Sequence, residues 1–254
     1  MFLTATIDNS LDKSRLDQAI VKLKLVESRQ KAFSLIISGK VYLNDKKVVK
    51  AGSIIRSGEI IKIRKIENNW VSRGGIKLSK AIESFNLSIK NKVCLDLGSS
   101  TGGFTDVLLK KAASKVFCVD VGYGQLDWGI RNNKKVMVLE KTNARFLDES
   151  LITEKIDLLV CDVSFISIKK IIPNCIPLLN KFADLIILIK PQFEVGRENI
   201  SKGGIVKKKE VHEKVCRDIK NWFIKDLNKT VINLKESFIL GQKGNKEFFI
   251  HIKN

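Results

Sequence analysis

The stretch that most constrains the fold runs from Lys92 to Asp106, with the sequence KVCLDLGSSTGGFTD. An apolar run over 93–97 gives way to glycine, serine and threonine, and an amphipathic segment follows from about Gly103. This order predicts a buried strand, a tight turn and a helix, as in an α/β fold with a parallel sheet. The turn would lie at the carboxyl end of the strand, where backbone N–H groups face a ligand. Asp96 is expected at the strand tip, with its carboxylate directed into the crevice.

A second acidic residue indicates which ligand this turn binds. Asp120 ends the next apolar run, VFCVDVGYG, where an acid can accept hydrogen bonds from both hydroxyls of a ribose. The turn has no basic residue for a pyrophosphate, carries the Asp96 carboxylate, and lacks the dinucleotide spacing G-x-G-x-x-G. A cationic amino-acid ligand with a ribose fits better, so we expect S-adenosylmethionine as the cofactor. A purely structural glycine turn in a sheet without a nucleotide is the alternative.

The rest of the chain after residue 70 alternates in the same way. Strands are expected from Lys135 toward a polar loop at Asn143, over 156–162 and over 184–190; helices over 76–85, 122–132, 166–179 and 207–227; and a final antiparallel pair over 231–240 and 247–253. Strands that alternate with helices and end in a hairpin predict a mostly parallel, doubly wound α/β sheet.

The strand tips carry residues that could do chemistry. Parallel strands end at one edge of a sheet, so Asp96, Asp120, Asp162 and Lys190 should converge there. Desolvation lowers the pKa of lysine ammonium groups in general. A lysine with a lowered pKa, placed beside an aspartate, could remove or relay a hydroxyl proton. Methyl transfer to a ribose 2'-hydroxyl needs this help, together with alignment of the hydroxyl. An ordinary strand-end ion pair is the alternative.

Other kinds of methyl transfer leave different sequence marks. Transfer to an exocyclic amine usually uses a D/N-P-P-Y/F turn after the fourth strand, whereas this chain has DVSF over 162–165. Transfer to a pyrimidine carbon needs a cysteine nucleophile, and strand alternation directs Cys161 away from the site. Oxygen methylation is therefore the best match.

The first 66 residues have a different pattern. Leu16, Ala19, Ile20 and Leu23 form one apolar helical face, and a second helix is expected over 29–38, capped by Ser28, stopped by Gly39, and with Ala32, Phe33, Ile36 and Ile37 facing inward. A hairpin about Asn44 and Asp45 and a further strand over 54–63 follow. Two helices and a few short strands make a small α+β unit.

The charge balance points to a polyanionic partner. The 254 residues hold 46 Lys and Arg against 27 Asp and Glu, a formal net charge of +19. Such an excess favours nucleic acid, with a merely solvated basic surface as the alternative. No apolar run reaches the ~18 residues of a membrane-spanning helix, and no signal peptide pattern is present. The five cysteines and two histidines are scattered. We therefore expect a cytoplasmic protein with reduced thiols, no membrane segment and no metal.

The N-terminal motifs resemble a known RNA-binding module. RLDQAI, SRQKAF, ISGKVYLND and SGEIIKI are similar, in this order, to the S4 RNA-binding domain. The resemblance implies binding of structured RNA through a basic helical face, where shape and phosphates are read. It makes Arg15, Arg29, Gln30 and Lys31 the RNA-contact candidates, and Arg73 in the following SRGG turn is a further candidate.

The motifs after Trp70 resemble the TlyA family, the haemolysin A group of ribosomal RNA methyltransferases. SRGGIKL, LDLGSSTGGFTD, VDVGYGQL, EKTNAR, DVSFIS, LIKPQFEVG, KGGIV and GNKEFF match in order. The family joins an S4 domain to an FtsJ/RrmJ-like domain, a Rossmann-like class I S-adenosylmethionine-dependent methyltransferase. The resemblance implies 2'-O-methylation of cytidine in ribosomal RNA by a Lys-Asp-Lys-Glu tetrad. Carried over by motif, the tetrad is Lys77, Asp162, Lys190 and Glu247, with Glu236 as the alternative fourth member.

The resemblance also implies the cofactor residues. They are Asp96, Gly98, Ser100, Gly102, Gly103, Phe104, Asp120, Asn143 and Asp162. The expected boundaries are an S4-like domain over 1–66, a linker over 67–72 and a methyltransferase domain over 73–254. The partner would be ribosomal RNA or a ribosomal subunit. A non-catalytic assembly factor and a pore-forming haemolysin are the alternative functions, and the sequence does not reveal the oligomeric state.

Overall fold

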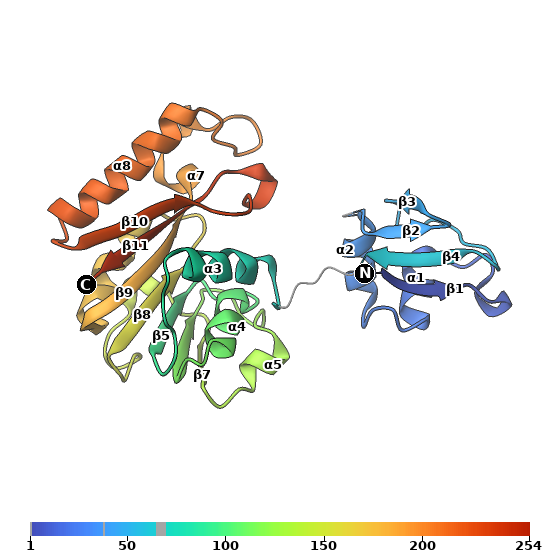
Figure 1. The fold of residues 1–254 in the computed structure, drawn as a ribbon, viewed down its shortest axis with the longest axis horizontal. Coiled ribbons are helices and arrows are strands. Elements are labelled where there is room, and N and C mark those ends of the chain that lie inside the picture. The colour runs from blue at the N-terminus through green and yellow to red at the C-terminus, as the bar shows by residue number, and fades with distance from the viewer. Residues whose placement is uncertain (1, 38, 65–69) are drawn as a thin grey trace. The chain divides into compact units, whose positions relative to one another are not determined.

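The computed structural model describes residues 2–37, 39–64 and 70–254 (Figure 1). The chain divides into two compact units, Met1–Glu67 and Asn68–Asn254, and each is described by itself. Part of the expected linker over 67–72 lies outside the described residues. Trp70 packs against the hydrophobic core of the second unit, and the Val71 N–H donates to the Asp106 carboxylate at 3.0 Å.

The first unit is a four-stranded antiparallel sheet with two helices. Its elements are β1 (Phe2–Thr6), α1 (Leu16–Lys22), α2 (Arg29–Ile37), β2 (Val41–Leu43), β3 (Lys46–Val48) and β4 (Ile60–Arg64). The strand order is β1-β4-β2-β3. Asn44 and Asp45 take φ angles of 46° and 65° between β2 and β3, which confirms the hairpin. The strand expected over 54–63 is wrong in its first half, because β4 begins at Ile60.

The expected inward face of α2 is also partly wrong. Ala32 and Ile36 are fully buried, but Phe33 and Ile37 are 50% and 55% exposed. Positions one apart in a helix lie about 100° from each other, so a short helix on a small sheet buries only one narrow stripe. The apolar pair Phe33 and Ile37 lies outside that stripe.

The second unit is built on a seven-stranded sheet in the order β10-β11-β9-β8-β5-β6-β7. Its helices and strands are α3 (Arg73–Ser84), β5 (Val93–Leu97), α4 (Gly103–Lys110), β6 (Lys115–Val119), α5 (Trp128–Arg131), β7 (Val136–Leu139), β8 (Ile156–Cys161), α6 (Ile172–Cys175), β9 (Leu179–Ile189), α7 (Pro191–Glu194), α8 (Lys209–Lys225), β10 (Thr230–Glu236) and β11 (Phe248–Lys253). Strands β5 to β9 pair in parallel, and β11 pairs antiparallel with β9 and β10.

Hydrophobic cores lie on both faces of this sheet. Alternate residues of β5 face opposite ways: Cys94 packs with α3 and α4, whereas Leu95 and Leu97 pack with α6 and α8. The predicted mostly parallel, doubly wound sheet and its final antiparallel pair are therefore confirmed. Cys161 lies in the core on the α6 and α8 face, as strand alternation predicted.

Several helix boundaries differ from the sequence expectations. The helix expected over 166–179 is broken into the 3-10 turn η3 (Ile168–Lys170), α6 and the 3-10 turn η4 (Ile176–Leu178). Pro173 and Pro177 cause the breaks, because proline lacks the N–H that continues a helix. The helix expected over 122–132 is only the single turn α5. Helix α3 begins earlier than expected, so Lys77 lies in its second turn.

Candidate active site

Of the four residues expected at the tips of the parallel strands, three directly follow a strand end. Asp120, Asp162 and Lys190 come directly after β6, β8 and β9. Because β8 and β9 are paired, the Lys190 ammonium and the Asp162 carboxylate meet, with Nζ 2.7 Å from Oδ1. Both side chains are largely buried, with exposed fractions of 9% and 20%. The strand tips therefore bring an acid and a base together at one edge of the sheet.

Lys190 has two further contacts with the segment that follows β8. Its Nζ donates to the Ser164 hydroxyl at 2.8 Å and to the Asp162 carbonyl oxygen at 3.3 Å. Asp162 Oδ1 is in charge contact with Nζ but has no aligned hydrogen bond among the described residues. This oxygen therefore keeps the capacity to accept a hydrogen bond from a substrate hydroxyl. Sequence reasoning missed Ser164, and its place in the DVSF motif beside Asp162 was the available signal.

Lys77 and Glu247 form a second buried ion pair. The Lys77 ammonium on α3 lies 2.6 Å from the Glu247 carboxylate, which precedes β11, and the side chains are 10% and 3% exposed. Gly241 allows this carboxylate to pack against the backbone, since a Cβ at Gly241 would lie 2.0 Å from Glu247 Oε1. The alternative Glu236 instead pairs with Lys246, and both of these side chains are about half exposed.

The two ion pairs lie in one cavity of about 560 Å³ together with the glycine turn. Nine of the predicted residues line it: Arg73, Lys77, Gly98, Ser100, Gly103, Phe104, Asp162, Lys190 and Glu247. Gly98 has a φ of +80°, and a Cβ there would lie 3.0 Å from the Asp162 carbonyl oxygen. Glycine at this position therefore lets the turn lie directly against the end of β8.

Four of the predicted cofactor residues do not line this cavity: Asp96, Gly102, Asp120 and Asn143. Gly102 instead stands at the N-cap of α4, with a φ of +93°. The Asp120 carboxylate accepts from the N–H groups of Ser100 at 2.8 Å and Gly122 at 2.7 Å, which ties it to the glycine turn. Asn143 accepts from the Arg145 N–H at 3.1 Å and caps the 3-10 turn η2 (Ala144–Phe146).

Asp96 lies inside β5 and not at its tip, which corrects the sequence expectation. The strand continues to Leu97, so the Asp96 side chain points toward α4 and is fully buried. Its Oδ2 accepts from the Thr105 hydroxyl at 2.6 Å, while Oδ1 has no hydrogen-bond partner in the described part of the chain. Burial raises the pKa of Asp96 to about 7. A buried acceptor without a partner is unusual in a folded protein, and this one lies inside the core beside the cavity wall formed by the glycine turn.

An aromatic pair lies at the mouth of the cavity. Phe165 follows Ser164 and is 90% exposed, and its ring centroid lies 5.2 Å from that of Phe193 on α7. The backbone of Phe165 has a φ of +66°, a left-handed conformation that costs energy for a side chain of this size. Both phenylalanines line the cavity.

Two of the four RNA-contact candidates in the first unit are held by a buried carboxylate. Asp17 accepts from Nε of Arg15 at 3.0 Å and from Nε of Arg29 at 2.9 Å, and hydrogen bonding from Arg15 holds the pKa of Asp17 below its usual value. The two arginines remain about half exposed. Gln30 is exposed, and Lys31 pairs with Glu27 on the surface.

Known proteins match this arrangement over nearly the whole chain. Residues 70–254 match the FtsJ-like methyltransferase family, and residues 14–61 match the S4 domain. The 16S/23S rRNA (cytidine-2'-O)-methyltransferase TlyA of Mycobacterium tuberculosis is 38% identical over 242 residues, covering 95% of this chain and 90% of that protein. This chain belongs to the TlyA family.

Two further matches are similarly extensive. Hemolysin A of Brachyspira hyodysenteriae is 40% identical to this TlyA-family chain, covering 93% of the chain and 98% of that protein. A solved structure of a candidate hemolysin from Streptococcus thermophilus matches with a TM-score of 0.76 and 37% identity, covering 96% of this chain and 89% of that one. The resemblance inferred from the sequence motifs is therefore confirmed.

Proposed function

We propose that this TlyA-family chain transfers a methyl group from S-adenosylmethionine to the 2'-hydroxyl of cytidine in ribosomal RNA of the small subunit, the large subunit or both. The observation that carries the proposal is the buried Lys190–Asp162 pair, which lies in one cavity with the Lys77–Glu247 pair and the glycine turn. The TlyA relative from Mycobacterium tuberculosis is named as an rRNA (cytidine-2'-O)-methyltransferase, which is this reaction.

The residues at the carboxyl edge of the sheet fit S-adenosylmethionine. The unpartnered Asp96 Oδ1 supplies a buried negative charge for the α-ammonium group, and Asp120 supplies carboxylate oxygens for the ribose hydroxyls. The turn from Gly98 to Phe104 would hold the methionine end, and Asn143 would lie near the adenine. The bound cofactor would supply an electrophilic methyl group on its sulfonium.

The tetrad would position the substrate hydroxyl and take up its proton. Lys190 would relay the 2'-hydroxyl proton by passing one of its ammonium protons to the Asp162 carboxylate, or would accept it as the neutral amine, as the hydroxyl oxygen takes the methyl group from the sulfonium and the carbon–sulfur bond breaks. Asp162 orients the Lys190 ammonium at 2.7 Å. Lys77 positions the hydroxyl, and Glu247 fixes Lys77 at 2.6 Å. Because all four side chains are largely enclosed, their charges act at short range with little screening by water.

The substrate follows from the first unit and from the charge of the chain. An S4 domain with two half-exposed arginines on one carboxylate, in a chain of net charge +19, suits the phosphates of structured RNA. Arg73 could add a contact at the cavity, where its Nη2 donates to the Leu240 carbonyl at 2.9 Å. A ribosomal substrate would place the protein in the cytoplasm.

The test is transfer of a tritiated methyl group from S-adenosylmethionine to ribosomal subunits that lack the modification, followed by nucleoside analysis. We expect the label in 2'-O-methylcytidine. Label on a base would overturn the tetrad chemistry. Binding of cofactor and RNA without transfer would favour the assembly-factor alternative.

The haemolysin alternative has its own test. No helix among the described residues is long and apolar enough to cross a membrane. Purified protein added to dye-loaded vesicles is expected to cause no leakage, and leakage at low protein concentration would support a pore.

A further inference from the structure

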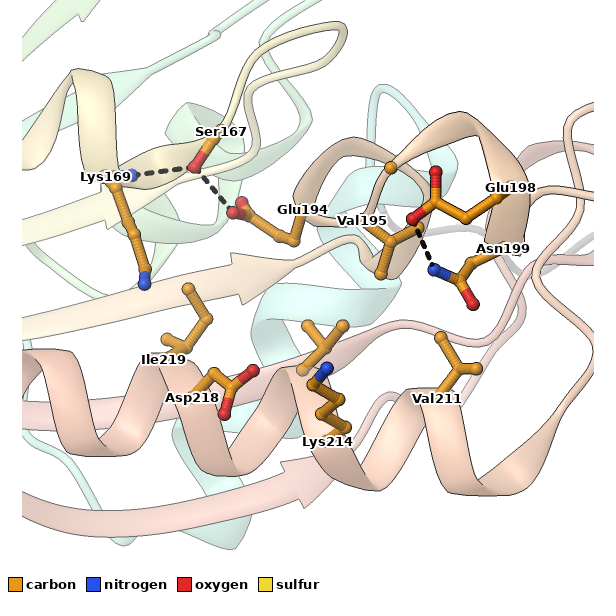
Figure 2. A pocket seen from close by; sticks show the side chains of 12 residues that line it. Ser167, Lys169, Glu194, Val195, Glu198, Asn199, Val211, Lys214, Asp218 and Ile219 are labelled. Carbon is orange, nitrogen blue, oxygen red and sulfur yellow. Dashed lines mark hydrogen bonds between the residues drawn. The ribbon is translucent and has the colours of Figure 1, made fainter.

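A second cavity of about 280 Å³ lies beside α8 (Figure 2). It is enclosed by α8, by the 3-10 turn η5 (Arg197–Asn199) and by the segments that follow β8 and β9. Helix α7 separates the two cavities. Lys190, Gln192 and Phe193 line the active-site cavity, whereas Glu194 and Val195 line the second one.

Glu194 uses both carboxylate oxygens to hold the segment after β8. Its Oε2 accepts from the Ser167 hydroxyl at 2.6 Å, and its Oε1 accepts from the Ile168 N–H at 3.0 Å. Ser167 Oγ also accepts from the Lys169 N–H at 3.2 Å and so caps η3 (Figure 2). Burial raises the pKa of Glu194, and the two hydrogen bonds act against that shift. The carboxylate is thus a bridge between α7 and the start of η3.

The same two segments meet again on the active-site side of α7. There the Lys190 ammonium donates to the Ser164 hydroxyl at 2.8 Å. Phe165 lies between Ser164 and the Glu194 bridge, and its φ of +66° is a strained conformation that its surroundings must hold in place. Since α7 is a single turn between Lys190 and Val195, Glu194 lies only one helical turn from this lysine.

We infer that Glu194 is a positioning residue that acts through the 164–168 segment to keep the Ser164 hydroxyl against the Lys190 ammonium. Glu194 itself does not touch the substrate. This role rests on the proposed function of Lys190, whose alignment with the 2'-hydroxyl requires a fixed ammonium. Without the bridge, the Phe165 backbone relaxes, Ser164 leaves Lys190, and the ammonium loses one of its three contacts.

The test compares three variants. Glu194→Ala removes the bridge. Glu194→Gln keeps it, because the amide oxygen accepts from Ile168 and the amide nitrogen donates to Ser167. Glu198→Ala is the matched control, since Glu198 lines the same cavity but, within the described part of the chain, its side chain accepts a hydrogen bond only from the neighbouring Asn199, at 2.9 Å. Amide hydrogen exchange over 163–170 and methyl-transfer kinetics are measured for each.

We expect Glu194→Ala to speed exchange over 163–170 and to lower kcat by about 10- to 100-fold, with the dissociation constants for cofactor and RNA within about twofold of wild type. Glu194→Gln should show the exchange rate and the kcat of wild type, and Glu198→Ala should change neither the exchange rate nor kcat. Wild-type exchange in Glu194→Ala overturns the bridge, and faster exchange with a wild-type kcat overturns the positioning role.

The exchange measurement separates this inference from the proposed function. If wild-type protein transfers no methyl group, the proposed function fails, while the exchange comparison still decides whether Glu194 holds the segment. Should Glu194→Ala fail to fold, Ser167→Ala removes one of the two hydrogen bonds to Glu194 together with the cap of η3, and it supports the same comparison.

Discussion

Removing the Glu247 carboxylate should lower the stability of the protein far more than removing the Glu236 carboxylate. Glu247→Ala leaves the Lys77 ammonium, which is 10% exposed, buried without its counter-ion. Breaking a buried ion pair in this way costs about 3–5 kcal/mol, which for a unit of this size lowers Tm by roughly 6–20 °C. Glu236→Ala breaks a pair whose side chains are 46% and 49% exposed, and such pairs contribute about 0–1 kcal/mol.

Thermal unfolding and methyl transfer are both measured for these variants. A third variant, Lys77→Met with Glu247→Leu, removes the whole pair and should regain most of the lost stability without regaining methyl transfer. This result would separate the catalytic role of the pair from its contribution to the fold. Equal Tm values for Glu247→Ala and Glu236→Ala, or loss of methyl transfer only in Glu236→Ala, would refute the reasoning.

Three further predictions follow from the charges of the two units. The pKa of Asp96 is about 7, and its ionised form attracts the α-ammonium group of S-adenosylmethionine. The affinity for this cofactor, measured by titration calorimetry, should therefore fall as the pH drops below about 7, approaching a tenfold loss per pH unit. Asp96→Asn should flatten this dependence. Burial alone would raise the pKa of Asp184, but hydrogen bonds from a histidine and two lysines lower it. Asp184→Asn should therefore destabilise the protein at pH 7 in urea unfolding, and the difference from wild type should shrink as the pH falls below about 4. Replacing Arg15 or Arg29 by alanine should weaken ribosomal RNA binding and lower its salt dependence by about one ion each, whereas an unchanged slope would exclude a phosphate contact.

The meeting of Asp162 and Lys190 could be predicted from sequence because it depends only on topology. Parallel neighbours end at the same edge, and apolar runs that stop at a charged residue identify that edge. The buried Lys77 could be found only through the family motif, because an isolated lysine near a helix start is common on protein surfaces. Its partner Glu247 reaches it from a segment 170 positions away in the sequence.

Other features depended on details that periodicity does not contain. Whether Asp96 lies at the tip of β5 or one residue before it depends on where the strand ends, and the apolar pattern does not determine that end to a single residue. Ser164 and Glu194 belong to recognised motifs, but their hydrogen bonds join loops whose conformation includes a left-handed phenylalanine. Sequence propensity gives no sign of such a residue, because tertiary contacts hold it in place.

The most direct test of the central claim is single-turnover methyl transfer by Lys190→Ala with cofactor and ribosomal RNA already bound. Binding of both ligands is measured first, so that only the chemical step is compared with wild type. If Lys190 accepts or relays the 2'-hydroxyl proton, the variant should bind both ligands normally and form 2'-O-methylcytidine at least about 100-fold more slowly. A wild-type rate in the fully bound variant would contradict the assignment of Lys190 and the tetrad chemistry built on it.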